Sequence, residues 1–273
     1  MENNKLVKIV SVLDKRVSKK NHDLLSIIRE INDKSINKFF DSFEAKGGKK
    51  REVVSALNLF FAKKFADDRV WNDKMTPPVV GDLVALISNR LGLIKRGITI
   101  VDPNVIFPDF IFQFLSHFNL PFFASSSIPE VRQSTKYLSN LYNFNLSKEQ
   151  NYNLLISRFS EKDFKEKSGK VFGGNLIAKN GYAILLINNQ FLQNKIFIEF
   201  LQIYNYFQLI GIIKLPENFF VNKKSSLSLL ILKRKVDNKK VDIPVLLSQM
   251  PELSNRKNFS VFLSKLSKWK KII

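Results

Sequence analysis

Six short apolar segments between residues 98 and 232 place the strongest constraint on how this chain can fold. They are rich in β-branched and aliphatic residues and comprise Ile98–Val101, Pro121–Ala124, Leu154–Ser157, Ala183–Ile187, Leu209–Lys214 and Leu227–Leu232. Each has the length of a strand that is buried on both faces of a sheet. Helical patterns lie between them, over Phe110–Phe118, Val131–Tyr142 and Phe191–Tyr206. Because strands and helices alternate, we expect an α/β fold with βαβ units and a mostly parallel sheet.

The last two predicted strands are connected in a different way. The loop between Lys214 and Leu227 contains Pro216 and the pair Lys223-Lys224, and it has no helical pattern. A loop of this kind suits an antiparallel pair, whereas a parallel pair needs a long crossover connection. We therefore expect an antiparallel hairpin at one edge of the sheet.

Residues 1–75 have a helical texture throughout. Apolar residues recur at helical spacing over Leu24–Ile31 and Val53–Phe65, with a basic turn, Gly47–Arg51, between them. The chain thus divides into a helical N-terminal domain (1–75), an α/β domain (76–240) and a basic C-terminal tail (241–273). The end of the tail, Val261–Ile273, has the pattern of an amphipathic basic helix. We expect it to pack on the domain, and the alternative is a helix that contacts nucleic acid or a membrane surface.

The composition excludes several classes of site. The chain has no cysteine, so disulfides, thiolate zinc sites and a cysteine nucleophile are all absent. Its two histidines, His22 and His117, lie far apart in sequence, and we expect no metal site. The N-terminus is polar and no apolar run approaches the roughly 18 residues of a membrane span, so a cytoplasmic protein is expected.

The net charge of +20 is far from average. Residues 211–273 contain 14 basic and 4 acidic residues, so half of the excess lies in the last quarter of the chain. Such an excess favours a polyanionic partner, most commonly nucleic acid and secondly an acidic membrane surface. The alternative is a solvated basic surface without a partner.

Two ordered sets of residues resemble a known family. The first is Thr76-Pro77-Pro78 before a predicted helix, followed by a strand that ends in Asp102-Pro103. The second is the strand Gly181–Ile187, then a strand that runs into Leu215-Pro216-Glu217-Asn218-Phe219 and a last strand, 226–235, that ends in lysine. Over about residues 70–235 the chain resembles the N6-adenine-specific DNA methyltransferases, which are class I enzymes dependent on S-adenosylmethionine. The resemblance implies a Rossmann-like sheet and a nucleic-acid substrate.

The cofactor positions implied by the resemblance are Thr76, Pro77, Asp102 and Pro103. The family has a Gly-x-Gly turn after Asp-Pro, because a missing Cβ lets the backbone approach S-adenosylmethionine. This chain has Ile106 and Pro108 at the glycine positions. The family also has an acidic residue after the second strand for the ribose hydroxyls, where this chain has Ser125-Ser126-Ser127, with Glu130 further on.

The catalytic position implied by the resemblance follows the strand Leu154–Ser157. The family has Asn/Asp-Pro-Pro-Tyr/Phe there, which accepts hydrogen bonds from the adenine amino group and stacks on the flipped base. This chain reads Arg158-Phe159-Ser160-Glu161. Arginine cannot accept a hydrogen bond, whereas Phe159 could still stack on a base, although it stands one position early. The sequence therefore predicts a degenerate member in which catalysis is lost.

The resulting hypothesis is a nucleic-acid-binding protein, with DNA favoured over RNA. The residues expected to contact it are basic or aromatic and comprise Lys49, Lys50, Arg51, Phe219, Lys223, Lys224, Lys233, Arg234 and Lys235. One alternative is an active methyltransferase with an altered pocket. Another is a protein-interaction module whose old cofactor cleft is filled by Ile106, Phe107 and Phe159. The N-terminal helices are also a candidate homodimer surface.

Overall fold

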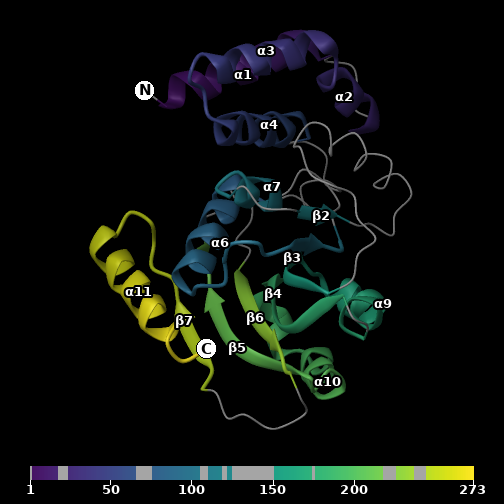
Figure 1. Ribbon diagram of the computed structural model, residues 1–273, viewed down its shortest axis with the longest axis vertical. Helices are drawn as coiled ribbons and strands as arrows, with labels where there is room; N and C mark the ends of the chain where they lie inside the picture. Colours follow the sequence, from purple (N-terminus) through teal and green to yellow (C-terminus); the bar gives the residue numbers. More distant parts are fainter. Residues whose placement is uncertain are drawn as a thin grey trace. The chain divides into compact units, whose positions relative to one another are not determined.

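A computed structural model describes residues 2–17, 24–65, 76–104, 110–118, 122–124, 151–173, 176–217, 226–236 and 244–273 (Figure 1). The chain forms two compact units. The first unit consists of Met1–Ala85 and Val105–Leu146, and the second consists of Leu86–Asn104 and Ser147–Ile273. None of the helices in the described ranges is both long and apolar enough to cross a membrane.

The first unit is mainly helical. Its elements are α1 (Glu2–Arg16), α2 (Leu24–Ile31), α3 (Lys34–Ala45), α4 (Lys50–Lys64), the first part of α6 (Pro78–Arg90), α7 (Phe110–Leu115) and the short strand β2 (Phe122–Ala124). α1 packs against α4, and the fully buried side chains of Ile9, Leu13 and Phe61 contribute to the core of this unit. The apolar residues of α4 explain this packing, because they lie on most faces of the helix and are buried there.

A network of hydrogen-bonded polar side chains connects α4, α6 and α7 inside the first unit. Ser55 donates to Gln113 Oε1 (2.8 Å), and Gln113 Nε2 donates to Asp82 Oδ1 (2.8 Å). The same carboxylate oxygen lies 2.5 Å from His117 Nε2. Gly81 permits this close approach, because a Cβ there would lie 2.3 Å from the Phe110 carbonyl oxygen. His117 therefore has a structural partner in this unit.

Six of the seven described strands lie in the second unit. They are β1 (Ile100–Asp102), β3 (Tyr152–Arg158), β4 (Ile177–Asn188), β5 (Phe207–Lys214), β6 (Leu227–Arg234) and β7 (Leu246–Gln249). They pair in the order β1-β3-β4-β6-β5-β7. β1, β3 and β4 are parallel, and β6 is antiparallel to both β4 and β5. The mostly parallel sheet and the antiparallel pair of β5 and β6 are thus confirmed.

Because β6 runs against its neighbours, different segments meet at the two ends of the strands. The start of β6, Leu227, pairs with Asn188 at the carboxyl end of β4. Its late residue Lys233 pairs with Tyr182, nearer the beginning of β4. We call the edge where β3, β4 and β5 end the carboxyl edge, and the edge where they begin and β6 ends the amino edge.

The helices of the second unit are α9 (Glu161–Phe172), the 3-10 helix η1 (Asn189–Gln193), α10 (Lys195–Ile203) and α11 (Arg256–Trp269). The predicted helix Phe191–Tyr206 is thus broken, because Asn194 has extended backbone and its side chain accepts from Ile196 N–H to cap α10. The predicted helix Phe110–Phe118 ends at Leu115. The predicted helix Val131–Tyr142 lies outside the described residues.

Three elements were not predicted as they stand. α9 carries few apolar residues, so its pattern was weak. β7 pairs parallel with β5 and alternates between half-buried and exposed positions, so it does not read as a buried strand. β4 begins six residues earlier than predicted, because its start contains the polar residues Lys179 and Asn180.

An aromatic cluster fills the space between the sheet and the helices α9 and α10. The ring of Phe172 is fully buried, and its centroid lies 4.9 Å from that of Phe200 and 5.3 Å from that of Phe207. Phe164 stacks on Phe191 at 4.2 Å. Edge-to-face contacts of this kind stabilise a core beyond the burial of area alone.

We predict that Phe172→Ala lowers the free energy of unfolding of the second unit by about 3–5 kcal/mol, because it opens a cavity among these rings. Ile198→Ala on α10 is the control, since that side chain is 54% exposed, and it should change stability by less than about 0.5 kcal/mol. Urea denaturation followed by tryptophan fluorescence and circular dichroism measures both. Equal effects of the two variants would contradict the assignment of this core.

Candidate functional site

A cavity of about 480 Å³ opens at the carboxyl edge of the second unit. It lies where β3 and β4 end and β6 begins, and its lining comprises Arg158, Phe159, Ser160, Glu161, Leu186, Asn188, Gln190, Phe191, Asn194 and Leu227. All four residues at the predicted catalytic position are therefore brought together at one cavity. The carboxyl ends of strands are where α/β sheets commonly bind ligands.

Arg158 is the last residue of β3 and is half-buried. Its carbonyl oxygen accepts a hydrogen bond from Asn104 Nδ2 at 3.1 Å. Its side chain lines the cavity at the place where the resemblance puts a hydrogen-bond acceptor. A guanidinium only donates hydrogen bonds, so this side chain cannot accept one from an amine.

Phe159 lies in the core. Its side chain is 2% exposed, and its ring packs against Phe164 and Phe172, with centroids 5.2 Å and 5.9 Å away. Its N–H donates to the carbonyl oxygen of Leu186 at 3.0 Å, which fixes the backbone beside β4. The ring face is therefore covered by other rings, and the expectation that it could stack on a base is not supported.

Ser160 and Glu161 begin α9. Ser160 Oγ accepts from the N–H of Asp163 (3.2 Å), and the Asp163 carboxylate accepts from the N–H of Ser160 (2.9 Å). This reciprocal pair is a capping box, which satisfies the open backbone donors at a helix start. Glu161 forms an ion pair with Lys165 one turn later, at 2.9 Å. Both residues thus have local structural partners.

Asp102 closes β1 and is 3% exposed. Its Oδ1 accepts from Ser157 Oγ at 2.6 Å and from the N–H of Asn104 at 2.9 Å. Pro103 beside it is half-buried. The carboxylate of Asp102 is therefore used to join β1 to β3, and it does not fit the role of an exposed S-adenosylmethionine ligand.

The other predicted cofactor residues divide between two groups. Thr76 is buried in the first unit, and the Pro77 carbonyl oxygen accepts from Val80 N–H at 3.0 Å at the start of α6. Ile106, Pro108, Ser125-Ser126-Ser127 and Glu130 lie outside the described residues. Within the described ranges, no group of three His, Asp or Glu side chains could hold a metal ion.

The predicted nucleic-acid ligands at the end of β6 hold main-chain oxygens. Lys233 Nζ donates to the Ile273 oxygen at 2.8 Å, and Lys235 Nζ donates to the Asn205 oxygen at 2.7 Å. Arg234 donates to the Ile177 carbonyl oxygen and lies over the Tyr206 ring. All three are half-buried and lie at the amino edge, on the opposite side of the sheet from the cavity.

The remaining predicted ligands lie elsewhere. Lys49 and Lys50 are exposed at the start of α4, where the N–H of Lys49 donates to Glu52 Oε2 at 2.7 Å. Arg51 is half-buried in the first turn of the same helix. Phe219, Lys223 and Lys224 lie outside the described residues.

A polar network beside the cavity was missed in the sequence. Asn189 Nδ2 donates to Ser226 Oγ, and Ser228 Oγ donates to Asn189 Oδ1, so the amide bridges η1 to the start of β6. Asn188 accepts from the N–H of Gln190 and caps η1. The signal was the run Asn188-Asn189-Gln190 directly after an apolar strand.

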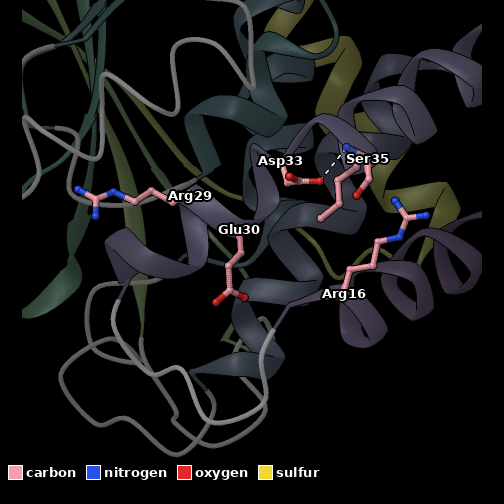
Figure 2. Close-up of a pocket in the computed structure, with 6 residues that line it drawn as sticks. Arg16, Arg29, Glu30, Asp33 and Ser35 are labelled. Carbon is pink, nitrogen blue, oxygen red and sulfur yellow. Dashed lines mark hydrogen bonds between the residues drawn. The ribbon is translucent and has the colours of Figure 1, made fainter.

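A second cavity, of about 370 Å³, lies among α1, α2 and α3 of the first unit (Figure 2). Asp33 caps α3 there, and hydrogen bonds from the side chain and the backbone N–H of Ser35 lower its pKa. Figure 2 shows Arg29 pointing away from Asp33. Helix capping thus explains the placement of Asp33 and Ser35, and Arg29 does not converge with them on one point.

We predict that Ser160→Ala lowers the free energy of unfolding by about 1 kcal/mol, because α9 loses its cap. Ser160→Thr is the matched variant and should stay near wild type, since threonine also caps. Urea titration measures both. An unchanged stability in Ser160→Ala would contradict the structural role assigned to this residue.

Solved structures of other proteins share this architecture. No protein-family model matches the chain, and no curated protein matches it in sequence. The solved structure of a protein from Listeria monocytogenes, assigned as a class I S-adenosylmethionine-dependent methyltransferase, matches with a TM-score of 0.77 at 17% identity, over 98% of this chain and 99% of that one.

Two larger proteins match over part of their length. One is the methyltransferase subunit of a type I restriction-modification system from Streptococcus thermophilus (TM-score 0.53, 11% identity, 80% of this chain and 58% of that one). The other is a modification subunit of a type I restriction enzyme from Vibrio vulnificus (TM-score 0.53, 15% identity, 81% and 57%). This chain therefore spans a little over half of each subunit. With the strand order above, these likenesses show that the chain has the fold of the class I S-adenosylmethionine-dependent methyltransferases.

Proposed function

We propose that this chain is a nucleic-acid-binding protein built on the class I methyltransferase fold, in which methyl transfer to adenine has been lost. The observation that carries the proposal is the use of the residues after β3. At the position where the resemblance implies an amine acceptor and a stacking ring, this chain has a donor, a core phenylalanine and a helix cap.

Transfer to an adenine amino group requires acceptors that orient the nitrogen lone pair toward the methyl donor. Arg158 supplies none, because its guanidinium has only N–H groups. The same guanidinium would disfavour the positive charge that develops on the amine during transfer. The Phe159 ring is enclosed by Phe164 and Phe172, so it does not replace the family's stacking residue.

The cofactor side supports the same proposal. Asp102 is buried and its carboxylate binds Ser157 and Asn104. In the sequence, Ile106 and Pro108 stand at the glycine positions, where a side chain restricts the approach of a ligand to the backbone. We infer that S-adenosylmethionine binds weakly or not at all.

The charge of the chain supports nucleic acid as the partner. The net charge is +20, and phosphate contacts by Lys and Arg supply much of the affinity of such proteins. The fold is shared with two subunits of type I restriction-modification systems, and this likeness supports nucleic acid as the proposed partner. Lys49, Lys50, Arg51, Phe219, Lys223 and Lys224 remain proposed contacts.

We expect isothermal titration calorimetry with S-adenosylmethionine at millimolar concentration to give no binding heat. The reason is that the Asp102 carboxylate already accepts hydrogen bonds from Ser157 and Asn104. An N6-adenine DNA methyltransferase titrated in parallel is the positive control. Measurable binding that Asp102→Asn abolishes, together with methylation of DNA, would contradict the proposal and favour an active enzyme.

We also expect the wild-type protein to bind duplex DNA with an affinity that falls steeply with salt. Each neutralised phosphate contributes roughly −0.9 to the slope of log K against log salt concentration. Fluorescence anisotropy over a series of salt concentrations measures this slope. A flat salt dependence, or no binding at low salt, would contradict nucleic acid as the partner.

A further inference from the structure

The second unit has an uneven distribution of charge. Cations gather at its amino edge, and six of them define what we call the basic edge: the exposed Lys95, Arg96, Lys179, Lys270 and Lys271 and the half-buried Lys235. We infer that the basic edge, rather than the cavity at the carboxyl edge, binds the phosphate backbone of a nucleic-acid duplex. This inference rests on the proposed function and specifies the surface involved.

Contacts within the second unit bring these residues to one place. Lys270 packs on Gly92 shortly before β1, since a Cβ on Gly92 would lie 2.5 Å from Lys270 Cε. Lys95 lies in the loop before β1, where its carbonyl oxygen accepts from the N–H of Ile98 (3.4 Å), and its charge opposes the rise in the pKa of Tyr182 that burial causes. Lys271 is two residues from Ile273, whose oxygen accepts from Lys233.

The other members lie on the same edge through their strands. Lys179 is the third residue of β4, which begins at Ile177. Lys235 follows the end of β6, and its Nζ binds the Asn205 oxygen just before β5. A lysine has three donors, so this bond leaves others for a phosphate.

Carboxylates are found elsewhere in the second unit. Its described acidic residues are Asp102, Glu161, Asp163, Glu166, Glu199, Glu217 and Glu252. Asp102 is buried, Glu166 and Glu199 pair with lysines on α9 and α10, and the others follow the carboxyl ends of strands. Within the described part of this unit the basic edge therefore has no acidic neighbour to offset its charge. Outside that part, residues 237–243 contain two acidic and two basic residues, and residues 147–150 contain one of each, so neither segment adds net charge.

The half-buried cations of β6 support this surface without being its contacts. Lys233 and Arg234 bind the oxygens of Ile273 and Ile177, so they fix the end of the chain and the start of β4 in place. Their charges remain at the edge and add to its potential. A rigid array of cations on a sheet edge is suited to a polymer with regularly spaced phosphates.

Nucleic acid fits this edge better than a membrane surface does. A helix that binds membranes carries a broad apolar face toward the lipid. The outward face of α11, beside the basic edge, carries mainly lysines and serines, with Val261 as its exposed large apolar residue. Val236 and Ile272 are also exposed, next to Lys235 and Lys271. These single residues are not the broad apolar face that a membrane-binding helix carries.

The test compares two triple variants that remove the same charge. Lys95→Gln/Lys179→Gln/Lys271→Gln neutralises the basic edge, and Lys162→Gln/Lys165→Gln/Lys195→Gln neutralises exposed lysines at the starts of α9 and α10. Duplex DNA binding is measured by anisotropy over a salt series, and thermal melting checks that both variants are folded. We expect the edge variant to bind roughly tenfold or more weakly, with a salt slope reduced by about three, and the control to match wild type.

Three results would overturn the inference. If wild type binds DNA and the edge variant binds equally well, the inference fails while the proposed function stands. If Lys223→Ala/Lys224→Ala abolishes binding and the edge variant does not, the contact lies in the 218–225 loop instead. If wild type binds phosphatidylserine vesicles but no duplex, the partner is a membrane, and the proposed function fails as well.

Discussion

The direction of β6 is the constraint on which the rest of the second unit depends. This strand lies between β4 and β5 and pairs antiparallel with both, and its first six residues are buried. Because it runs against its neighbours, its start borders the cavity of Arg158 and Asn188, and its end carries Lys233–Lys235 to the opposite edge. A parallel strand with the same sequence would have placed these cations beside the cavity. One reversal of direction thus separates the cavity from Lys233, Arg234 and Lys235.

The sequence allowed the sheet to be predicted because its strands are continuous aliphatic runs. It did not show β7, whose residues are half-exposed, or the break before α10, which depends on the Asn194 cap. Arg158 and the three residues that follow it line one cavity, but the sequence did not show that Phe159 lies in the core or that Ser160 caps α9. A phenylalanine after a strand reads the same whether its ring faces a ligand or the core, and only the packing of α9 decides between them. Likewise, sequence alone cannot tell whether a lysine faces solvent or holds a carbonyl oxygen, as Lys233 does.

The corner where β1 and β3 end shows how the polar groups of a ligand site can serve stability. Asp102, Asn104 and Ser157 bind one another, and Ser160 and Asp163 cap the next helix. Buried polar groups are costly unless they are paired, so this corner is stabilised when its side chains satisfy each other. The closed network around Asp102 meets this requirement.

The bond between Lys233 and the oxygen of Ile273 has a practical consequence for anyone handling this protein. Residues appended after Ile273, such as an affinity tag, would emerge among the lysines at the end of α11. A histidine-rich or acidic extension there would alter the local potential and compete with phosphate. Purification handles are therefore better fused to the other terminus, or removed before nucleic-acid affinity is measured.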